Sequence, residues 1–69
     1  MFNEKAFKRA IEDAGLSMEE VAQLLNINVV TLYRKINGES DFYRKEIQKI
    51  SSVIGKDRIM EIFFASKVA

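Results

Sequence analysis

The sequence predicts an all-α protein of five short helices. Its apolar residues recur at spacings of three and four and do not alternate as they would in strands. At five places a candidate helix cap has an apolar residue just before it and another at the fourth helical position, the spacing of a hydrophobic staple. Because proline and linker-like segments are absent, we expect one compact domain over residues 1–69. The five caps are Asn3, Ser17, Asn28, Tyr43 and Gly55.

The first two helices have clear start and stop signals. Residues 4–14 should form the first helix, which ends before Gly15, because glycine readily takes the left-handed conformation that follows many helices. Residues 18–25 should form the second. Ser17 and Glu20, three residues apart at its start, form a capping box in which each side chain bonds the other residue's backbone N–H.

The last three helices follow the same rules. Residues 29–36 should form the third helix, which stops at an Asn-Gly turn dipeptide. Residues 44–54 and 56–65 should form the fourth and fifth. The fourth begins at Tyr43, which is a poor cap because its side chain is not among those that bond the first free N–H groups well.

Only three residues separate the second and third predicted helices, so the chain must turn sharply between them. Asn26 suits this turn because asparagine is one of the few residues besides glycine that tolerate a positive φ. Ala22 is small, as the contact position between two steeply crossing helices requires. The pattern therefore indicates a helix-turn-helix unit.

These residues resemble the lambda-type Cro and repressor proteins, an XRE-like helix-turn-helix family of phage and prophage regulators. The resemblance rests on G-L-S-M-E-E-V-A-Q-L-L-N-I, on V-V-T-L-Y-R-K-I-N-G and on the apolar positions of the last two helices, and it covers most of the chain. It implies a five-helix, lambda-repressor-like fold and a Cro-like repressor that occupies an operator on double-stranded DNA and excludes polymerase.

The chain departs from the family pattern at three positions. Asn26 stands where the family usually has glycine. Met18 and Val29 stand where many members carry a glutamine that touches phosphate or base. The glutamine contacts of the family are therefore not carried over to these two positions.

One face of the third predicted helix points away from its apolar side and carries Val30 and Arg34 in a single stripe. The major groove of B-DNA admits one helix, arginine can bond guanine bidentately, and a small apolar group can contact the thymine methyl. We therefore expect Val30 and Arg34 to read base edges. Val29 and Thr31 should lie nearby, and the resemblance likewise implies base contact at Val29, Val30 and Arg34.

Phosphate contacts should surround the base-reading residues. The resemblance implies such contacts at the turn formed by Asn37 and Gly38. Other basic or hydroxyl side chains could bond phosphates around the groove, each cation giving salt-dependent affinity. Glu39 and Asp41 would repel the DNA backbone if they faced it. The further candidates are Tyr33, Lys35, Arg44 and Lys45.

The fifth predicted helix is apolar on more sides than a monomer needs. One face would fill the core, which leaves Val53, Met60 and Phe64 for a two-fold interface. We expect a homodimer that sets two recognition helices about 34 Å apart, one turn of DNA, on a palindromic site. The alternative is that Phe64 folds back onto its own core.

Composition limits the other functional classes. Without Cys or His, disulfides, thiolate or imidazole metal sites and the common nucleophile–base pairs are all excluded. We therefore expect no enzymatic activity, no metal, no cofactor and no small-molecule substrate. No apolar run approaches the ~18 residues of a membrane span, and the N-terminus does not resemble a signal peptide, so we expect a cytoplasmic protein.

The net charge of +1 is small for a nucleic-acid binder, so the placement of the basic residues must carry binding. An alternative is a protein-interaction module, in which the same fold acts as an antitoxin-like or anti-repressor adaptor and Val30 and Phe64 bind protein. Val30 and Arg34 would otherwise be ordinary surface residues. The favoured hypothesis is a sequence-specific, double-stranded DNA-binding repressor.

Overall fold

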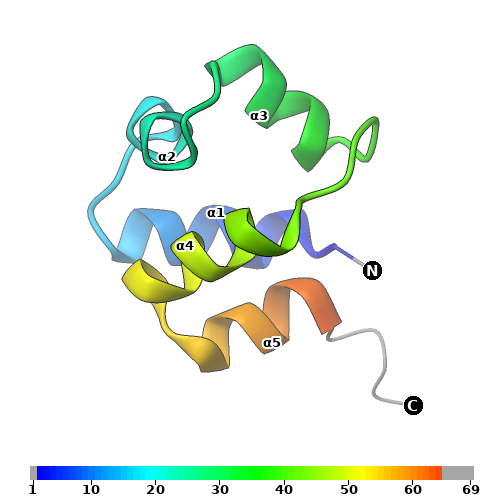
Figure 1. Cartoon of the computed structure of the whole chain (residues 1–69). Coiled ribbons are helices and arrows are strands. Elements are labelled where there is room, and N and C mark those ends of the chain that lie inside the picture. The colour runs from blue at the N-terminus through cyan, green and yellow to red at the C-terminus, as the bar shows by residue number, and fades with distance from the viewer. Residues whose placement is uncertain (1, 65–69) are drawn as a thin grey trace.

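The computed structural model describes residues 2–64, which form five helices and, within that range, no strand (Figure 1). The all-α prediction is therefore confirmed. The predicted bounds hold, except that the first helix ends one residue earlier and that the predicted end of the fifth, Ala65, lies outside the described residues. The helices are α1 (Glu4–Asp13), α2 (Met18–Leu25), α3 (Val29–Ile36), α4 (Arg44–Ile54) and α5 (Lys56–Phe64).

Polar side chains begin the first three helices as the sequence predicts. Each accepts a hydrogen bond from the backbone N–H three residues later, which satisfies one of the free donors at a helix start. Glu20 also accepts a bond from the Ser17 N–H, so the capping box is present. The donor–acceptor distances are 3.1 Å for Asn3 with Ala6, 3.1 Å for Ser17 with Glu20 and 2.9 Å for Asn28 with Thr31.

The turn between α2 and α3 depends on Asn26, whose φ of 59° lies in the left-handed region. Its N–H donates to the Gln23 carbonyl, and the Ile27 N–H donates to the Ala22 carbonyl, both at 3.0 Å. This pair of bonds is a Schellman ending, which closes a helix and reverses the chain. Ala22 is buried at this point, as a close helix crossing requires.

The contacts between helices leave α3 and α5 apart. α1 packs on α5, α4 packs on both α5 and α2, and α3 packs on α2. In Figure 1, α2 and α3 lie at one end of the molecule and α5 at the other. The largest fully buried side chains between them are Phe7, Ile11, Val21, Leu32, Ile50 and Ile62.

Four phenylalanine rings gather from segments that are distant in the sequence. Phe2 precedes α1, Phe7 belongs to α1, Phe42 lies in the loop before α4, and Phe63 belongs to α5. The ring centroids are 5.2 Å apart for Phe2 and Phe42 and 5.4 Å apart for Phe42 and Phe63, within the range of attractive ring contacts. The rings therefore fix the loop that follows α3 against α1 and α5.

Candidate nucleic-acid interface

α3 turns one side to the core and the other to solvent. Leu32 and Ile36 are buried, whereas Arg34 is exposed and Val30 is 56% exposed. Val30 and Arg34 are four positions apart, so they lie on one face, which we call the α3 outer face. Within the described range, the Arg34 guanidinium has no ion pair or side-chain hydrogen bond. Its donors are therefore available to an external acceptor.

Val29 and Thr31 border the α3 outer face and are both half-buried. Val29 lies at the border between the buried and the exposed side of α3, as the helical repeat predicts. Thr31 is more enclosed than that spacing predicts, and its N–H is bonded to the Asn28 side chain. Of the four predicted base-reading side chains, Val30 and Arg34 are therefore the most accessible.

A shallow hollow lies between the start of α2 and the side of α3. Met18 and Val29, which stand where many members of the resembling family carry glutamine, both line it. The sequence did not predict that these two side chains would meet, and the turn at Asn26 brings them together. The hollow thus offers apolar atoms beside the α3 outer face, together with the carboxylate of Glu19. Its lining residues are Ser17, Met18, Glu19, Val29 and Tyr33.

Lys35 was predicted to bind phosphate, but its side chain is engaged inside the protein. Its side chain is buried, with only 4% of the residue exposed, and its Nζ lies 3.1 Å from Oε1 of Glu46. The same Nζ donates to the main-chain oxygen of Asp41 at 2.9 Å. The ammonium is thus enclosed and already bonded, so it does not face a phosphate. The sequence places Lys35 next to the buried Ile36 but does not show that Glu46 of α4 lies beside it.

The other predicted phosphate ligands are exposed and lie on both sides of one loop. Tyr33, Asn37 and Gly38 are at the end of α3, and Arg44 and Lys45 form the start of α4. Backbone N–H groups are already used at this turn, since that of Asn37 donates to the Tyr33 carbonyl at 2.9 Å and that of Gly38 to the Lys35 carbonyl at 3.2 Å. For every candidate except Gly38, which has no side chain, the side chain is therefore the group left to bind phosphate. The loop between them also exposes Glu39 and Asp41.

The three residues predicted for a dimer interface are all exposed apolar side chains. Val53 is in α4, and Met60 and Phe64 are in α5 and are 58% and 43% exposed. We call these three residues the α5 patch. α5 lies at the opposite end of the molecule from α3, so the α5 patch and the α3 outer face can be occupied at the same time (Figure 1).

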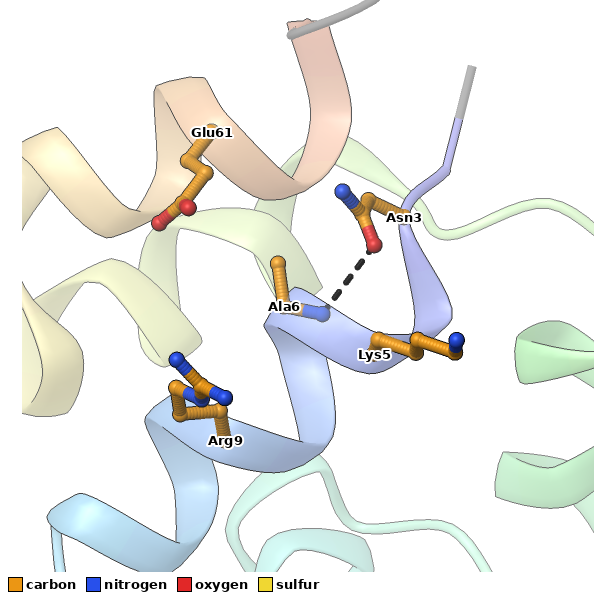
Figure 2. Close-up of a pocket in the computed structure, with 5 residues that line it drawn as sticks. All are labelled: Asn3, Lys5, Ala6, Arg9 and Glu61. Atoms are coloured by element: carbon orange, nitrogen blue, oxygen red, sulfur yellow. Dashed lines mark hydrogen bonds between the residues drawn. The ribbon is translucent and has the colours of Figure 1, made fainter.

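A second hollow lies between α1 and α5 and was not anticipated from the sequence (Figure 2). Arg9 reaches it from α1 and Glu61 from α5, and the Asn3 side chain beside it is engaged in capping α1. The hollow presents cations and a carboxylate but no nucleophile and base in contact. The lining residues of this hollow are Asn3, Lys5, Ala6, Arg9 and Glu61.

Residues 2–64 contain no cluster of metal-binding side chains and no helix long and apolar enough to span a membrane.

The chain matches a known protein family over most of its length. A family model described as helix-turn-helix matches residues 7–58, a segment that begins in α1 and ends in the first turn of α5. The match includes the turn at Asn26 and the whole of α3. No curated protein and no solved structure matches the chain.

Proposed function

Since the chain belongs to the XRE-type helix-turn-helix family, whose members are DNA-binding transcription regulators and not enzymes, we propose that it is a sequence-specific, Cro-like repressor. In this proposal α3 enters the major groove of a palindromic operator, and bound protein excludes polymerase. The observation that carries it is the α3 outer face, where an exposed Val30 lies one turn from Arg34, whose guanidinium has no ion pair among residues 2–64.

The chemistry of the α3 outer face matches two base edges. Guanine presents two acceptors in the major groove, and the guanidinium of Arg34 has the paired donors to bond both. Thymine presents a methyl group, which the apolar atoms of Val30 can contact. Val30 lies one turn of α3 from Arg34. A helix with these two side chains would therefore favour a half-site in which a G and a T lie close together.

Phosphate contacts would come from the ends of α3 and α4. Arg44 and Lys45 are exposed cations in the first turn of α4, and Tyr33 and Asn37 offer a hydroxyl and an amide at the end of α3. Gly38 lacks a side chain, so the DNA backbone can approach the turn closely. Lys35 is not part of this set, because its ammonium is paired with Glu46.

Selection of bound duplexes from a random DNA pool tests the proposal without a known target. We expect enrichment of an inverted repeat whose half-sites lie about one helical turn apart. Binding to the enriched duplex should also weaken steeply with salt, by about 0.9 logarithmic units of affinity per logarithmic unit of salt for each phosphate contact. If no sequence is enriched, the repressor assignment is wrong, and the adaptor alternative, in which Val30 and Phe64 bind protein, replaces it.

We further propose that the α5 patch joins two copies of the chain. Exposed apolar side chains lose contact with water when a second copy covers them, and two-fold pairing is the commonest arrangement for soluble proteins. Because the patch is remote from α3, pairing through it leaves both α3 outer faces free for DNA.

Met60→Ser should weaken the dimer by about tenfold or more, because it removes a large apolar side chain from the interface. Val30→Ser is the matched control, since Val30 is similarly exposed, at 56% against 58%, but lies on α3. Sedimentation equilibrium without DNA would give both dissociation constants. A wild-type chain that stays monomeric at high micromolar concentration, or equal effects of the two substitutions, would remove the α5 patch from the dimer interface.

A further inference from the structure

The buried ammonium of Lys35 connects α3 to the start of α4. It contacts the Glu46 carboxylate at 3.1 Å and the Asp41 main-chain oxygen at 2.9 Å, and it lies 4.2 Å from the centre of the Tyr43 ring. Glu46 in turn accepts a hydrogen bond of 2.8 Å from the Tyr43 N–H. We call Lys35, Tyr43 and Glu46 the α3–α4 clamp.

The clamp is not explained by stability alone. Lys35 and Glu46 are only 4% and 8% exposed, so both charges lose most of their hydration on folding. That loss offsets much of the attraction between them, and apolar residues of similar size often serve equally well. An ion pair with directional hydrogen bonds fixes one geometry, which apolar packing does not. Its role is therefore to be found in how it positions α3 relative to α4.

The clamp lies between the two groups of candidate DNA ligands. Lys35 directly follows Arg34 in α3, and Glu46 directly follows Lys45 in α4. α3 and α4 both pack on α2, and α4 also packs on α5. The clamp adds a direct polar link between α3 and α4. The separation of Arg34 from Lys45 therefore depends on this link, together with the packing of both helices on α2 and the loop that Phe42 fixes.

We propose that the α3–α4 clamp is a positioning device that sets the distance between the base-reading Arg34 and the phosphate-binding start of α4, and thereby determines operator specificity without touching DNA. This inference rests on the proposed function. Arginine discriminates bases only when its two donors align with both guanine acceptors. A phosphate anchor held at a fixed distance provides that alignment, because phosphate contacts set the register of the protein on the duplex.

Replacing the pair with apolar side chains separates positioning from folding. In Lys35→Met/Glu46→Leu, we expect a folded chain with a melting temperature close to that of the wild type, since apolar packing replaces the ion pair while the Tyr43 N–H and the Asp41 oxygen lose their partners. The ratio of affinities for the selected and a scrambled duplex should nevertheless fall about tenfold, the effect of losing roughly one base contact. Glu46→Gln, which keeps an oxygen for the Tyr43 N–H and removes only the charge, should lower the ratio less.

The matched control removes the same two residue types from the surface. Lys8 and Glu4 form a pair at 3.0 Å on α1, with side chains about half exposed. Like the clamp variant, Lys8→Met/Glu4→Leu leaves the net charge unchanged. It should leave the affinity ratio at its wild-type value. An unchanged ratio in the folded clamp variant, or an equal fall in the control, would overturn the proposal.

A second readout needs no DNA. Because the chain has no cysteine, Arg34→Cys and Lys45→Cys introduce the only two attachment sites for spin labels. Electron paramagnetic resonance would then give the distribution of distances between them. We expect a broader or shifted distribution when the clamp pair is replaced, and an identical distribution would overturn the positioning role. If the wild-type chain enriches no duplex, the proposed function fails, and the label distances still decide whether the clamp positions α3.

Discussion

Phe7→Ala is expected to lower the free energy of unfolding by about 3–5 kcal/mol, the usual range for truncating a buried phenylalanine. Phe7 is completely buried, and its ring lies 5.4 Å from Phe2 and 5.9 Å from Phe42, centre to centre. Truncation would leave a cavity in the α1 side of the core and remove these ring contacts. A chain of this size is stable by roughly 3–10 kcal/mol in total, so the substitution should come close to unfolding it.

Urea unfolding followed by circular dichroism measures this loss. Phe7→Leu retains most of the apolar volume and should cost less than about 1.5 kcal/mol, which keeps the comparison measurable if the alanine variant does not fold. Tyr33→Ala is the control for removing an aromatic ring from an exposed helix site, and its effect should be within about 0.5 kcal/mol. A loss below about 1 kcal/mol for Phe7→Ala would show that the ring cluster does not organise the core.

The ring cluster also affects the interface at a distance. Phe42 belongs to the loop between α3 and α4, and its ring contacts those of Phe2 and Phe63. The loop is therefore anchored on the core at one side and bonded to Lys35 through Asp41 at the other. Anchoring at two points limits how far the start of α4 can move relative to α3.

Helix boundaries were predictable because their signals are local. A cap bonds a backbone group only three residues away, as Ser17 does with Glu20, and the left-handed turn needs only a residue of the right type at Asn26. Exposure of Val30 and Arg34 was also predictable, since the helical repeat places each residue relative to the axis of its own helix.

The environment of Lys35 was not predictable in the same way. The helical repeat does not say which neighbouring helix lies beside a given position, and Glu46 belongs to another helix beyond a loop. A lysine assigned by its charge to a phosphate thus proved to be buried against a carboxylate. The meeting of Met18 with Val29 in one hollow likewise depends on the crossing of α2 and α3, which neither helix specifies alone.

Arg34→Ala should weaken binding to the selected duplex by about 10- to 100-fold and abolish the preference for guanine at one position in each half-site. The loss is that of a bidentate contact, so the affinity for duplexes altered at that base pair should change much less. Competition binding with single base-pair variants of the selected duplex would measure both effects.

Two other substitutions make the interpretation specific. Lys45→Ala removes an exposed cation from the start of α4 and should weaken binding to every duplex about equally, while reducing the salt dependence by about one phosphate contact per subunit. Arg9→Ala removes an arginine from the hollow between α1 and α5, and neither affinity nor sequence preference should change. If Arg34→Ala behaved like Lys45→Ala, weakening all duplexes alike, Arg34 would be a phosphate ligand, and base discrimination would have to come from Val29, Val30 and Thr31.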